Sequence, residues 1–153
     1  MNNLILVRHG QSEWNLENRF TGWVDVGLAA KGKLEACKAG ELIKELNLEL
    51  SYFYTSLQTR SIETLNLILN TMRIKDQNVV NAWELNERHY GALTGLNKDE
   101  MKKLYGEEKI HTFRRSWDNP PEPLKKTSPY LSLIHISEPT RPRLISYAVF
   151  CLK

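Results

Sequence analysis

The chain has 153 residues, of which 41% are hydrophobic and 25% charged, values typical of a globular protein with one domain. Its net charge of +3 is too small to indicate a nucleic-acid-binding protein, and no apolar run approaches the roughly 18 residues that span a bilayer. We therefore expect no nucleic-acid or membrane partner. The two cysteines, Cys37 and Cys151, suit neither a disulfide framework nor a metal site, so we expect a cytoplasmic protein.

Strand and helix patterns alternate along the first half of the chain. The continuous apolar run Leu4–Val7 predicts a strand that is buried on both faces, as in a parallel sheet. Residues 31–47 predict a helix, because apolar side chains recur there at helical spacing and should form its buried face: Leu34, Cys37, Leu42, Ile43 and Leu46.

A second strand is predicted at residues 51–55, where three aromatic side chains favour β-structure. Ser56 follows it and could cap the next helix, whose buried face would hold Ile62, Leu65, Leu69 and Met72. A third short strand is predicted at residues 78–80. This alternation predicts an α/β fold around a mostly parallel sheet, in which ligands bind at the carboxyl ends of the strands.

The second half of the chain is less regular. Asn97 and Glu100 have the spacing of a capping box that starts a helix, and Gly106 suits the end of that helix. A further helix is predicted over residues 107–117. Residues 118–129 contain four prolines and predict an extended linker or a lid.

The predicted first strand runs into Arg8, His9 and Gly10, and these residue types suit phosphoryl transfer. A neutral imidazole is a good nucleophile near pH 7, an adjacent guanidinium can bind a phosphate through two hydrogen bonds, and glycine lets the backbone come close to a ligand. Arg60 follows the second strand, so it should lie at the same edge of the sheet. The alternatives are a histidine that only hydrogen-bonds within the sheet and an Arg60 that is merely solvated.

Further polar candidates lie in the irregular segments. In the stretch LNERHYG, Glu87 could act as a general acid and base if it is held near an arginine. Lys98 and the pair Arg114 and Arg115 add cations, although each could equally be a surface charge. The segment FTGW, residues 20–23, offers a hydroxyl and a backbone amide beside a glycine.

Taken together, these segments resemble the cofactor-dependent phosphoglycerate mutases of the histidine phosphatase superfamily, in the order LVRHGQSEWN, RFTGW, YTSLQTR, LNERHYGALTGLNK and RR. The resemblance covers about residues 3–127. The RHG segment is shared across the superfamily, whereas LNERHYG and the GLNK that follows it point to the mutase branch. The resemblance implies a three-layer α/β sandwich with a mostly parallel sheet, histidine phosphatase-like and incomplete in this chain.

The resemblance also implies an activity, the interconversion of 2-phosphoglycerate and 3-phosphoglycerate in glycolysis and gluconeogenesis through a phosphohistidine. The substrate would be a small molecule, phosphoglycerate, and the cofactor would be 2,3-bisphosphoglycerate, which donates the priming phosphoryl group. The reaction would need no metal. His9 would be the nucleophile and Glu87 the proton donor and then the base, while Arg8 and Arg60 would hold the phosphoryl group. The other positions that match the family's substrate-binding residues are Ser12, Asn15, Thr21, Gly22, Arg88, Tyr90, Lys98, Arg114 and Arg115. Relatives are commonly dimers or tetramers, so the full-length form could be a homo-oligomer.

The chain departs from the family pattern at three points. Gln11 stands where many members have Glu, which is a mild change close to the nucleophile. Ala29 stands where Ser or Thr usually caps the first long helix, which costs about 1 kcal/mol. The family's second active-site histidine, in a segment of the HGNS type, has no counterpart, because His111 lies in a predicted helix and His135 in the tail. We therefore expect little or no turnover from the chain as it stands. The alternatives are a phosphatase of the same superfamily acting on small phosphoesters and a non-catalytic anion-binding fragment.

The resemblance stops after Tyr130. The closing segments LSLIHISEPTR and PRLISYAVFCLK look like translations of two sequencing adapters in tandem. We therefore predict a partial phosphoglycerate mutase domain at residues 1–130 and a non-native tail at residues 131–153, in which His135 and Cys151 have no functional role. The alternative is a short native tail.

Overall fold

The computed structural model describes residues 3–75, 77–116, 118–131 and 147–151 of the chain, which divides into two compact units. The first unit comprises residues 1–13, 25–87 and 145–153, and the second comprises residues 14–24 and 88–144. Each unit has a hydrophobic core of its own. Within the described residues, no helix combines the length and the apolar character needed to cross a bilayer.

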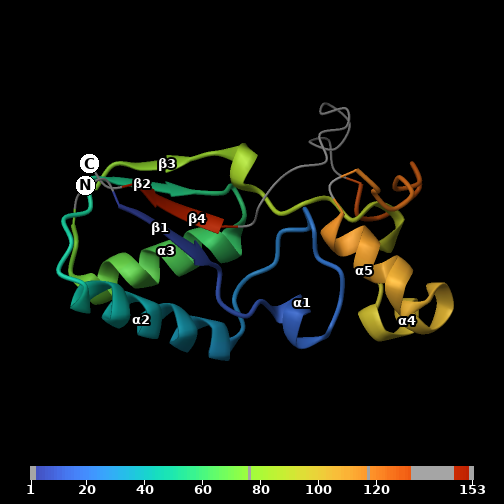
Figure 1. Cartoon of the computed structure of the whole chain (residues 1–153), viewed down its shortest axis with the longest axis horizontal. Coiled ribbons are helices and arrows are strands. Elements are labelled where there is room, and N and C mark those ends of the chain that lie inside the picture. The colour runs from blue at the N-terminus through green and yellow to red at the C-terminus, as the bar shows by residue number, and fades with distance from the viewer. Residues whose placement is uncertain (1–2, 76, 117, 132–146, 152–153) are drawn as a thin grey trace. The chain divides into compact units, whose positions relative to one another are not determined.

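The first unit is a four-stranded sheet with two long helices (Figure 1). A short 3₁₀ helix at Trp83–Leu85 follows the third strand. The main elements are β1 (Leu4–Arg8), α2 (Ala30–Glu45), β2 (Tyr52–Thr55), α3 (Thr59–Met72), β3 (Val79–Asn81) and β4 (Tyr147–Cys151).

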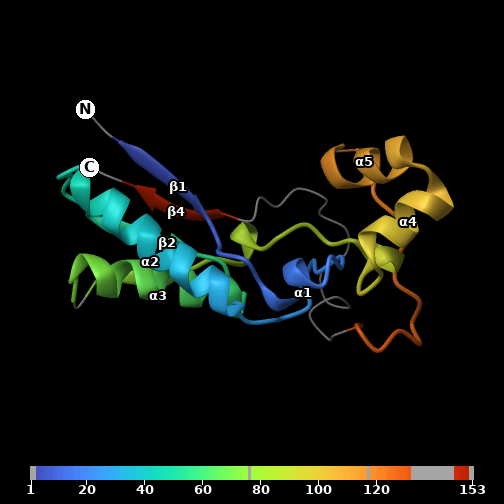
Figure 2. The ribbon, with the colours of Figure 1, turned by 90° about the horizontal axis from the view of Figure 1, so that it is seen from below.

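The strands lie in the order β1-β4-β2-β3, and β4 pairs antiparallel with both of its neighbours. Figure 2 shows β4 between β1 and β2. Phe150 of β4 lies opposite Ile5 of β1 on one side and opposite Phe53 of β2 on the other. β2 pairs parallel with β3, with Phe53 opposite Val79. Since β1 and β2 both run against β4, the three strands predicted from the sequence share one direction. The α/β class is therefore confirmed, and the antiparallel strand comes from the segment predicted to be a tail.

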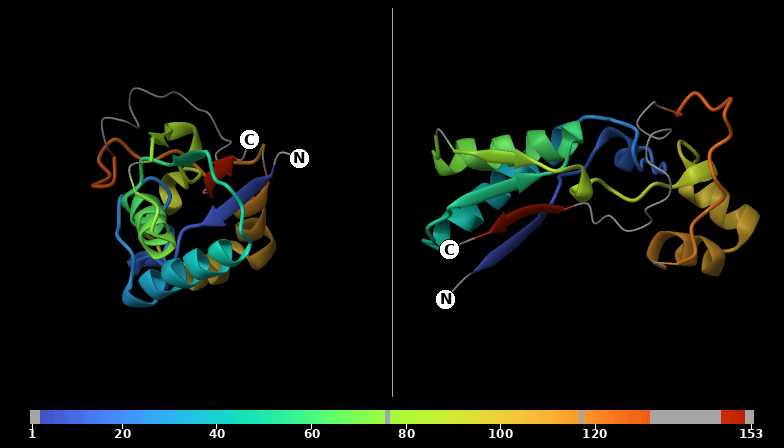
Figure 3. Two further views of the ribbon diagram at one scale, coloured as in Figure 1. Left: turned by 90° about the vertical axis from the view of Figure 1, so that its left-hand side faces the viewer. Right: turned by 90° about the horizontal axis from the view of Figure 1, so that it is seen from above.

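Both long helices cover the same face of the sheet, as Figure 3 shows. Ile5 and Val7 of β1 pack on this side against the core of the unit, which consists of Ile43, Phe53, Leu65, Ile68 and Leu69. Leu4 and Leu6 alternate with them and are 57% and 55% exposed. The prediction that β1 is buried on both faces is therefore wrong, because no described helix of this unit covers the second face. Of the three predicted layers, the described part of this unit contains two.

The buried face of α2 is also different from the predicted one. Of the predicted residues, Ile43 is buried, whereas Leu34, Leu42 and Leu46 are exposed. The other buried residues of the helix are Gly32, Ala36 and Gly40. Close helix packing explains the difference, since a β-carbon at Gly40 would lie 2.9 Å from the β-carbon of Thr71 in α3. Only small side chains fit such an approach, so the face with the large leucines is left outside. Cys37 is half-buried.

The helix α3 begins later than the capping prediction implied. Its N-cap is Gln58, and the Ser56 hydroxyl only accepts a hydrogen bond from the Gln58 N–H at 3.3 Å. The first helical N–H, that of Thr59, donates instead to the carboxylate of Asp25 at 2.7 Å. The predicted apolar face is confirmed, since Leu65 and Leu69 are buried in the core.

The second unit is built around short helices. α1 (Glu13–Leu16) leads into it, and α4 (Lys98–Tyr105) and α5 (Glu107–Arg115) follow a 3₁₀ helix at Gly91–Leu93. Its core consists of four buried side chains, with Met101 of α4 and Phe113 of α5 packed against them: Phe20, Tyr90, Leu93 and Ile110.

The predicted ends of α4 are confirmed. The Asn97 side-chain oxygen accepts hydrogen bonds from the N–H groups of Asp99 at 2.9 Å and Glu100 at 3.3 Å, which leaves fewer unsatisfied donors at the start of the helix. Gly106 follows the last turn with a φ of +86°, a conformation that glycine adopts easily. Residues 118–131 contain neither helix nor strand, as expected for a linker or lid.

The segment predicted to be a non-native tail is described only at Leu131 and in β4. His135 lies outside the described residues, and Cys151 is the last residue of β4. The origin of this segment stays a prediction.

Candidate active site

The end of β1 presents the predicted Arg8–His9–Gly10 sequence. Arg8 is the last residue of the strand and is exposed, whereas His9 is only 7% exposed. Gly10 packs against the backbone of α2, where a β-carbon would lie 2.8 Å from the carbonyl carbon of Gly32. Its N–H donates to the hydroxyl of Thr64 at 3.1 Å. A glycine is therefore required here by the close approach of two backbones, and the contact fixes the chain directly after the histidine.

The hydrogen bond of His9 determines which ring nitrogen is free to react. Nδ1 lies 2.7 Å from the carbonyl oxygen of Gly10, and since a carbonyl can only accept, Nδ1 carries the hydrogen. In the neutral ring the lone pair is then on Nε2. Burial lowers the pKa of His9 from 6.5 to about 4, with the positive charges of Arg60 and Arg8 acting in the same direction. The imidazole is therefore neutral, and Nε2 is available as a nucleophile, at pH 7.

Arg60 and Glu87 form the ion pair that the sequence suggests. The Arg60 side chain is fully buried in the first turn of α3, and its Nη2 donates to Glu87 Oε2 at 3.0 Å. The Glu87 side chain is 16% exposed. A carboxyl group held by an arginine beside a nucleophilic histidine can exchange protons with a substrate oxygen while the guanidinium binds an anion.

Thr64, which the sequence analysis did not single out, supports this arrangement. Its hydroxyl accepts from Gly10 and donates to the carbonyl of Arg60 at 2.7 Å, so it links the loop after β1 to the start of α3. The candidate Ser12 is fully buried and forms an isolated bridge with Leu28. The spacing of Thr64 four residues after Arg60 was a usable signal, because it places the two residues on one face of a helix.

The first two substrate-binding candidates of the second unit occupy a tight turn. Thr21 is 3% exposed, and its hydroxyl has no hydrogen-bond partner among the described residues. Gly22 has a φ of +58°, and a β-carbon there would lie 3.3 Å from both the carbonyl oxygen of Arg88 and the ring of Tyr90. A buried hydroxyl next to a backbone that can approach a ligand suits the binding of an oxygen-rich anion.

Two other candidates of this unit have clear packing roles. The ring of Tyr90 is 5.1 Å from that of Phe20, centroid to centroid, inside the core. Arg88 donates from Nη1 to the carbonyl of Phe113 at 3.0 Å and from Nη2 to that of Ser116 at 2.9 Å. Arg88 thus satisfies carbonyl groups at the C-terminal end of α5, where a cation is favoured by the helix dipole.

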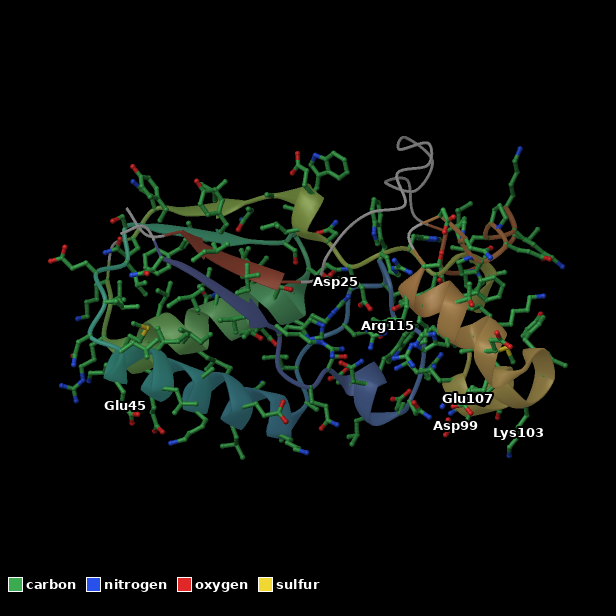
Figure 4. The ribbon with its side chains drawn as sticks, viewed as in Figure 1. Asp25, Glu45, Asp99, Lys103, Glu107 and Arg115 are labelled. Carbon is green, nitrogen blue, oxygen red and sulfur yellow. The ribbon has the colours of Figure 1, made fainter. Side chains whose placement is uncertain are left out.

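The remaining candidates lie on the helices of the second unit or at its start. Asn15 is in α1 and Lys98 is the first residue of α4, with its N–H bonded to the carbonyl of Asn18 at 2.8 Å. Arg114 and Arg115 lie in the last turn of α5. Arg115 is labelled in Figure 4.

The structure therefore divides the candidates by unit. Those assigned to catalysis, together with Ser12, lie in the first unit, and the others lie in the second. Among the described residues, no three His, Cys, Asp or Glu side chains are grouped in a way that could hold a metal ion. His111, one of the two histidines considered for the place of a second active-site histidine, is exposed on α5.

Comparison with known proteins finds matches over the first 130 residues of the chain. The model of the histidine phosphatase superfamily, branch 1, matches residues 4–130. The 2,3-bisphosphoglycerate-dependent phosphoglycerate mutase of Pelagibacter ubique (strain HTCC1062) is 67% identical over 130 residues, which are 85% of this chain and 54% of that protein. Phosphoglycerate mutase 1 of Saccharomyces cerevisiae (strain ATCC 204508 / S288c) is 52% identical over 130 residues, 85% of this chain and 53% of that protein. The chain thus spans about half the length of the curated relatives it matches.

Solved structures resemble the fold as well. A phosphoglycerate mutase from Bacillus anthracis str. Sterne has a TM-score of 0.59 at 25% identity, over 73% of this chain and 52% of that one. A mycobacterial glucosyl-3-phosphoglycerate phosphatase has a TM-score of 0.65 at 23% identity, over 78% of this chain and 56% of that one. The predicted histidine phosphatase-like fold is therefore confirmed.

Proposed function

The chain belongs to the histidine phosphatase superfamily, and on that basis we propose that it interconverts 2-phosphoglycerate and 3-phosphoglycerate by passing a phosphoryl group through His9. The observation that carries the proposal is the state of His9, which is buried and neutral and has Nδ1 bound to Gly10. The substrate is suggested by the names of the mutases from P. ubique and S. cerevisiae.

In the proposed reaction, Nε2 of His9 attacks the phosphorus atom of a bound phosphate ester. The N–P bond forms as the P–O bond to the ester oxygen breaks. The Gly10 carbonyl accepts from Nδ1–H throughout, so it orients the ring and stabilises the positive charge that develops on the imidazole. Arg60 and Arg8, whose charges act on His9, offset the negative charge of the phosphoryl group during its transfer.

Glu87 carries the proton in this proposal. It donates a proton to the ester oxygen as that oxygen leaves phosphorus, and it takes a proton from the hydroxyl of the next phosphoglycerate, which then attacks the phosphohistidine. Its ion pair with Arg60 keeps the carboxyl beside the group that holds the phosphoryl oxygens. One residue therefore serves both half-reactions, and the enzyme returns to its starting protonation state.

The candidates of the second unit carry groups that suit anion binding. Lys98, Arg114 and Arg115 offer positive charge for a carboxylate and a second phosphate, and the hydroxyl of Thr21 offers a hydrogen bond. These cationic and hydroxyl groups also suit 2,3-bisphosphoglycerate, which would supply the phosphoryl group that primes His9. No metal is needed for the steps assigned to these residues.

The proposal is tested by incubating the purified chain with 3-phosphoglycerate and 2,3-bisphosphoglycerate and following 2-phosphoglycerate by ³¹P NMR. A high protein concentration and a long incubation make the low turnover expected of this chain detectable. We expect 2-phosphoglycerate to form only when 2,3-bisphosphoglycerate is present, and neither product nor phosphohistidine to form with His9→Asn. Release of inorganic phosphate from varied phosphoesters without formation of 2-phosphoglycerate would replace the proposal with a phosphatase activity.

A matched chimera addresses the prediction of low turnover. Residues 1–130 of this chain are joined to the part of the P. ubique mutase that follows the matched region, and the chimera is assayed beside the chain as it stands. We expect the chimera to have the higher turnover. Equal and normal rates for the two proteins would contradict the predicted impairment while leaving the proposed reaction intact.

A further inference from the structure

The backbone pairing of β2 and β3 ends before the chain reaches the two residues of the ion pair. The last paired residues are Thr55 and Asn81, and one more backbone hydrogen bond follows, from the Ala82 N–H to the Thr55 carbonyl at 2.8 Å. One strand then leads into α3, which carries Arg60, and the other into the 3₁₀ helix before Glu87. From this point the strand pairing no longer sets the separation of the two segments.

Two amide side chains continue the connection where the backbone ladder stops. The side-chain oxygen of Asn86 accepts from the N–H of Leu57 at 3.0 Å, and that of Gln58 accepts from the N–H of Glu87 at 3.1 Å. Each segment thus supplies one side chain that binds the backbone of the other. Gln58 and Asn86 are 4% and 6% exposed, so water competes little for either bond.

The position of Gln58 shows that its side chain serves this connection and not the helix. It is the N-cap of α3, a position where a side-chain oxygen normally accepts from the first N–H groups of the helix, yet it makes no such bond. The Thr59 N–H is bound instead by Asp25, through a contact of 2.7 Å. The cap is therefore supplied from another segment, while Gln58 reaches across to Glu87.

We propose that Gln58 and Asn86 are positioning residues that hold the Glu87 carboxyl against Arg60 and so at the substrate. Arg60 is two residues after Gln58, and Glu87 directly follows Asn86. The two cross-links therefore hold together the two backbone segments that carry the partners of the 3.0 Å ion pair. The catalytic consequence rests on the proposed function, whereas the clamp itself is a property of the fold.

The choice of amides has a chemical reason. An amide oxygen accepts a hydrogen bond without adding a negative charge, and a carboxylate at Gln58 would repel a phosphoryl group bound by Arg60. Gln58→Glu should therefore keep the bond to Glu87 N–H but weaken anion binding. Gln58→Met has a similar length and no comparable acceptor, so it should break the bond without changing the charge.

The first measurement is amide hydrogen exchange in the full chain. We expect Gln58→Met to speed exchange at the Glu87 amide at least about tenfold relative to the core amide of Ile68, and Asn86→Leu to do the same at Leu57. Thr71→Val is the matched control, because it removes the 2.8 Å hydrogen bond from Thr71 to the Leu67 carbonyl on the same helix. Unchanged exchange at Glu87 in Gln58→Met would overturn the proposal.

The second measurement separates positioning from stability and from the proposed function. We expect Gln58→Met to lower kcat for the mutase reaction about 10- to 100-fold with KM nearly unchanged, Gln58→Glu to raise KM, and Thr71→Val to change neither. Faster exchange at Glu87 with an unaltered kcat would also overturn the positioning role. If neither the parent chain nor the chimera with the P. ubique mutase forms 2-phosphoglycerate although His9 is phosphorylated, the proposed function fails. The exchange result with the yield of phosphohistidine still decides whether Gln58 positions Glu87.

Discussion

Gly32 of α2 packs so closely against Gln11, two residues after His9, that a β-carbon at Gly32 would lie 2.7 Å from the Gln11 backbone nitrogen. The same approach places Gly32 against Gly10. The backbone that carries the nucleophile is thus supported by a helix whose own glycine leaves room for it. A glycine in the middle of a helix is unfavourable by itself, so its presence here follows from this contact.

Gly32→Ala tests the contact directly. Alanine is about 1 kcal/mol better than glycine inside a helix, but a methyl group forced against a backbone atom costs about 1–3 kcal/mol. We therefore expect a net loss in the free energy of unfolding, measured by urea denaturation. Lys33→Ala, at the exposed neighbouring position, should change it by less than about 0.5 kcal/mol. A more stable Gly32→Ala variant would show that the helix can move away from residues 10 and 11.

The low pKa of His9 predicts a loss of stability in mild acid. Its pKa is about 4 in the folded chain, against an ordinary value of 6.5 for a histidine in the unfolded chain, so the unfolded chain binds a proton first as the pH falls. Above pH 6.5 the histidine contributes no pH dependence. Between pH 6.5 and 4 the folded state loses roughly 3 kcal/mol relative to the unfolded state. The free energy of unfolding, measured by urea denaturation across this range, should fall more steeply with decreasing pH for the parent chain than for His9→Gln. An equal pH dependence in the two proteins would contradict the buried neutral imidazole.

The features that the sequence predicted correctly are mostly local. The Asn97 cap and the Gly106 end of α4 depend on a few neighbouring residues, and both are confirmed. The buried face of α2 was predicted only at Ile43, because the contact of this helix with α3 selects small residues, which a hydrophobic pattern does not mark. Its large leucines face away from that contact.

The candidate site shows the same division. The ends of β1 and β2 predicted that His9 and Arg60 lie at one edge of the sheet, and the structure brings Arg60 to Glu87. The roles of Gln58 and Asn86 were not predicted, since each depends on the register of β2 and β3 and on a turn of irregular backbone. The packing of Tyr90 and the binding of Arg88 to the end of α5 were not predicted either, because both depend on residues far away in the sequence.

Ala29 offers a way to stabilise the chain. It is the N-cap of α2 with an extended backbone, φ −66° and ψ 162°, and it has no side chain that can accept a hydrogen bond. A hydroxyl there would accept from an N–H in the first turn, so Ala29→Ser should raise the free energy of unfolding by about 1 kcal/mol. Ala30→Ser, one residue further into the helix, is the control and should give no gain in the same urea titration. An equal gain from both changes would indicate a cause other than capping.

Tyr130 anchors the proline-rich segment within the second unit. Its ring meets Trp14 edge-on with centroids 5.5 Å apart, its hydroxyl accepts from Arg19 Nη2 at 3.2 Å, and it covers Gly95. Tyr130→Ala should release the segment, so that trypsin cleaves at the exposed Lys125 and Lys126 several times faster. Tyr130→Phe keeps the ring and should cleave at nearly the parent rate. Equal rates for all three proteins would show that other contacts hold the segment.

Glu87→Gln separates proton transfer from the placement of Arg60. Glutamine keeps an oxygen that can accept from Arg60 Nη2, now at 3.0 Å from Glu87, but it cannot exchange a proton. The loss of a general acid and base costs about 10²- to 10⁴-fold in rate, so we expect kcat for the mutase reaction to fall by that factor. Glu84→Gln, three residues earlier and exposed, is the control and should keep the parent kcat. A Glu87→Gln variant with unaltered kcat would assign the proton transfer to another group and leave Glu87 only the ion pair.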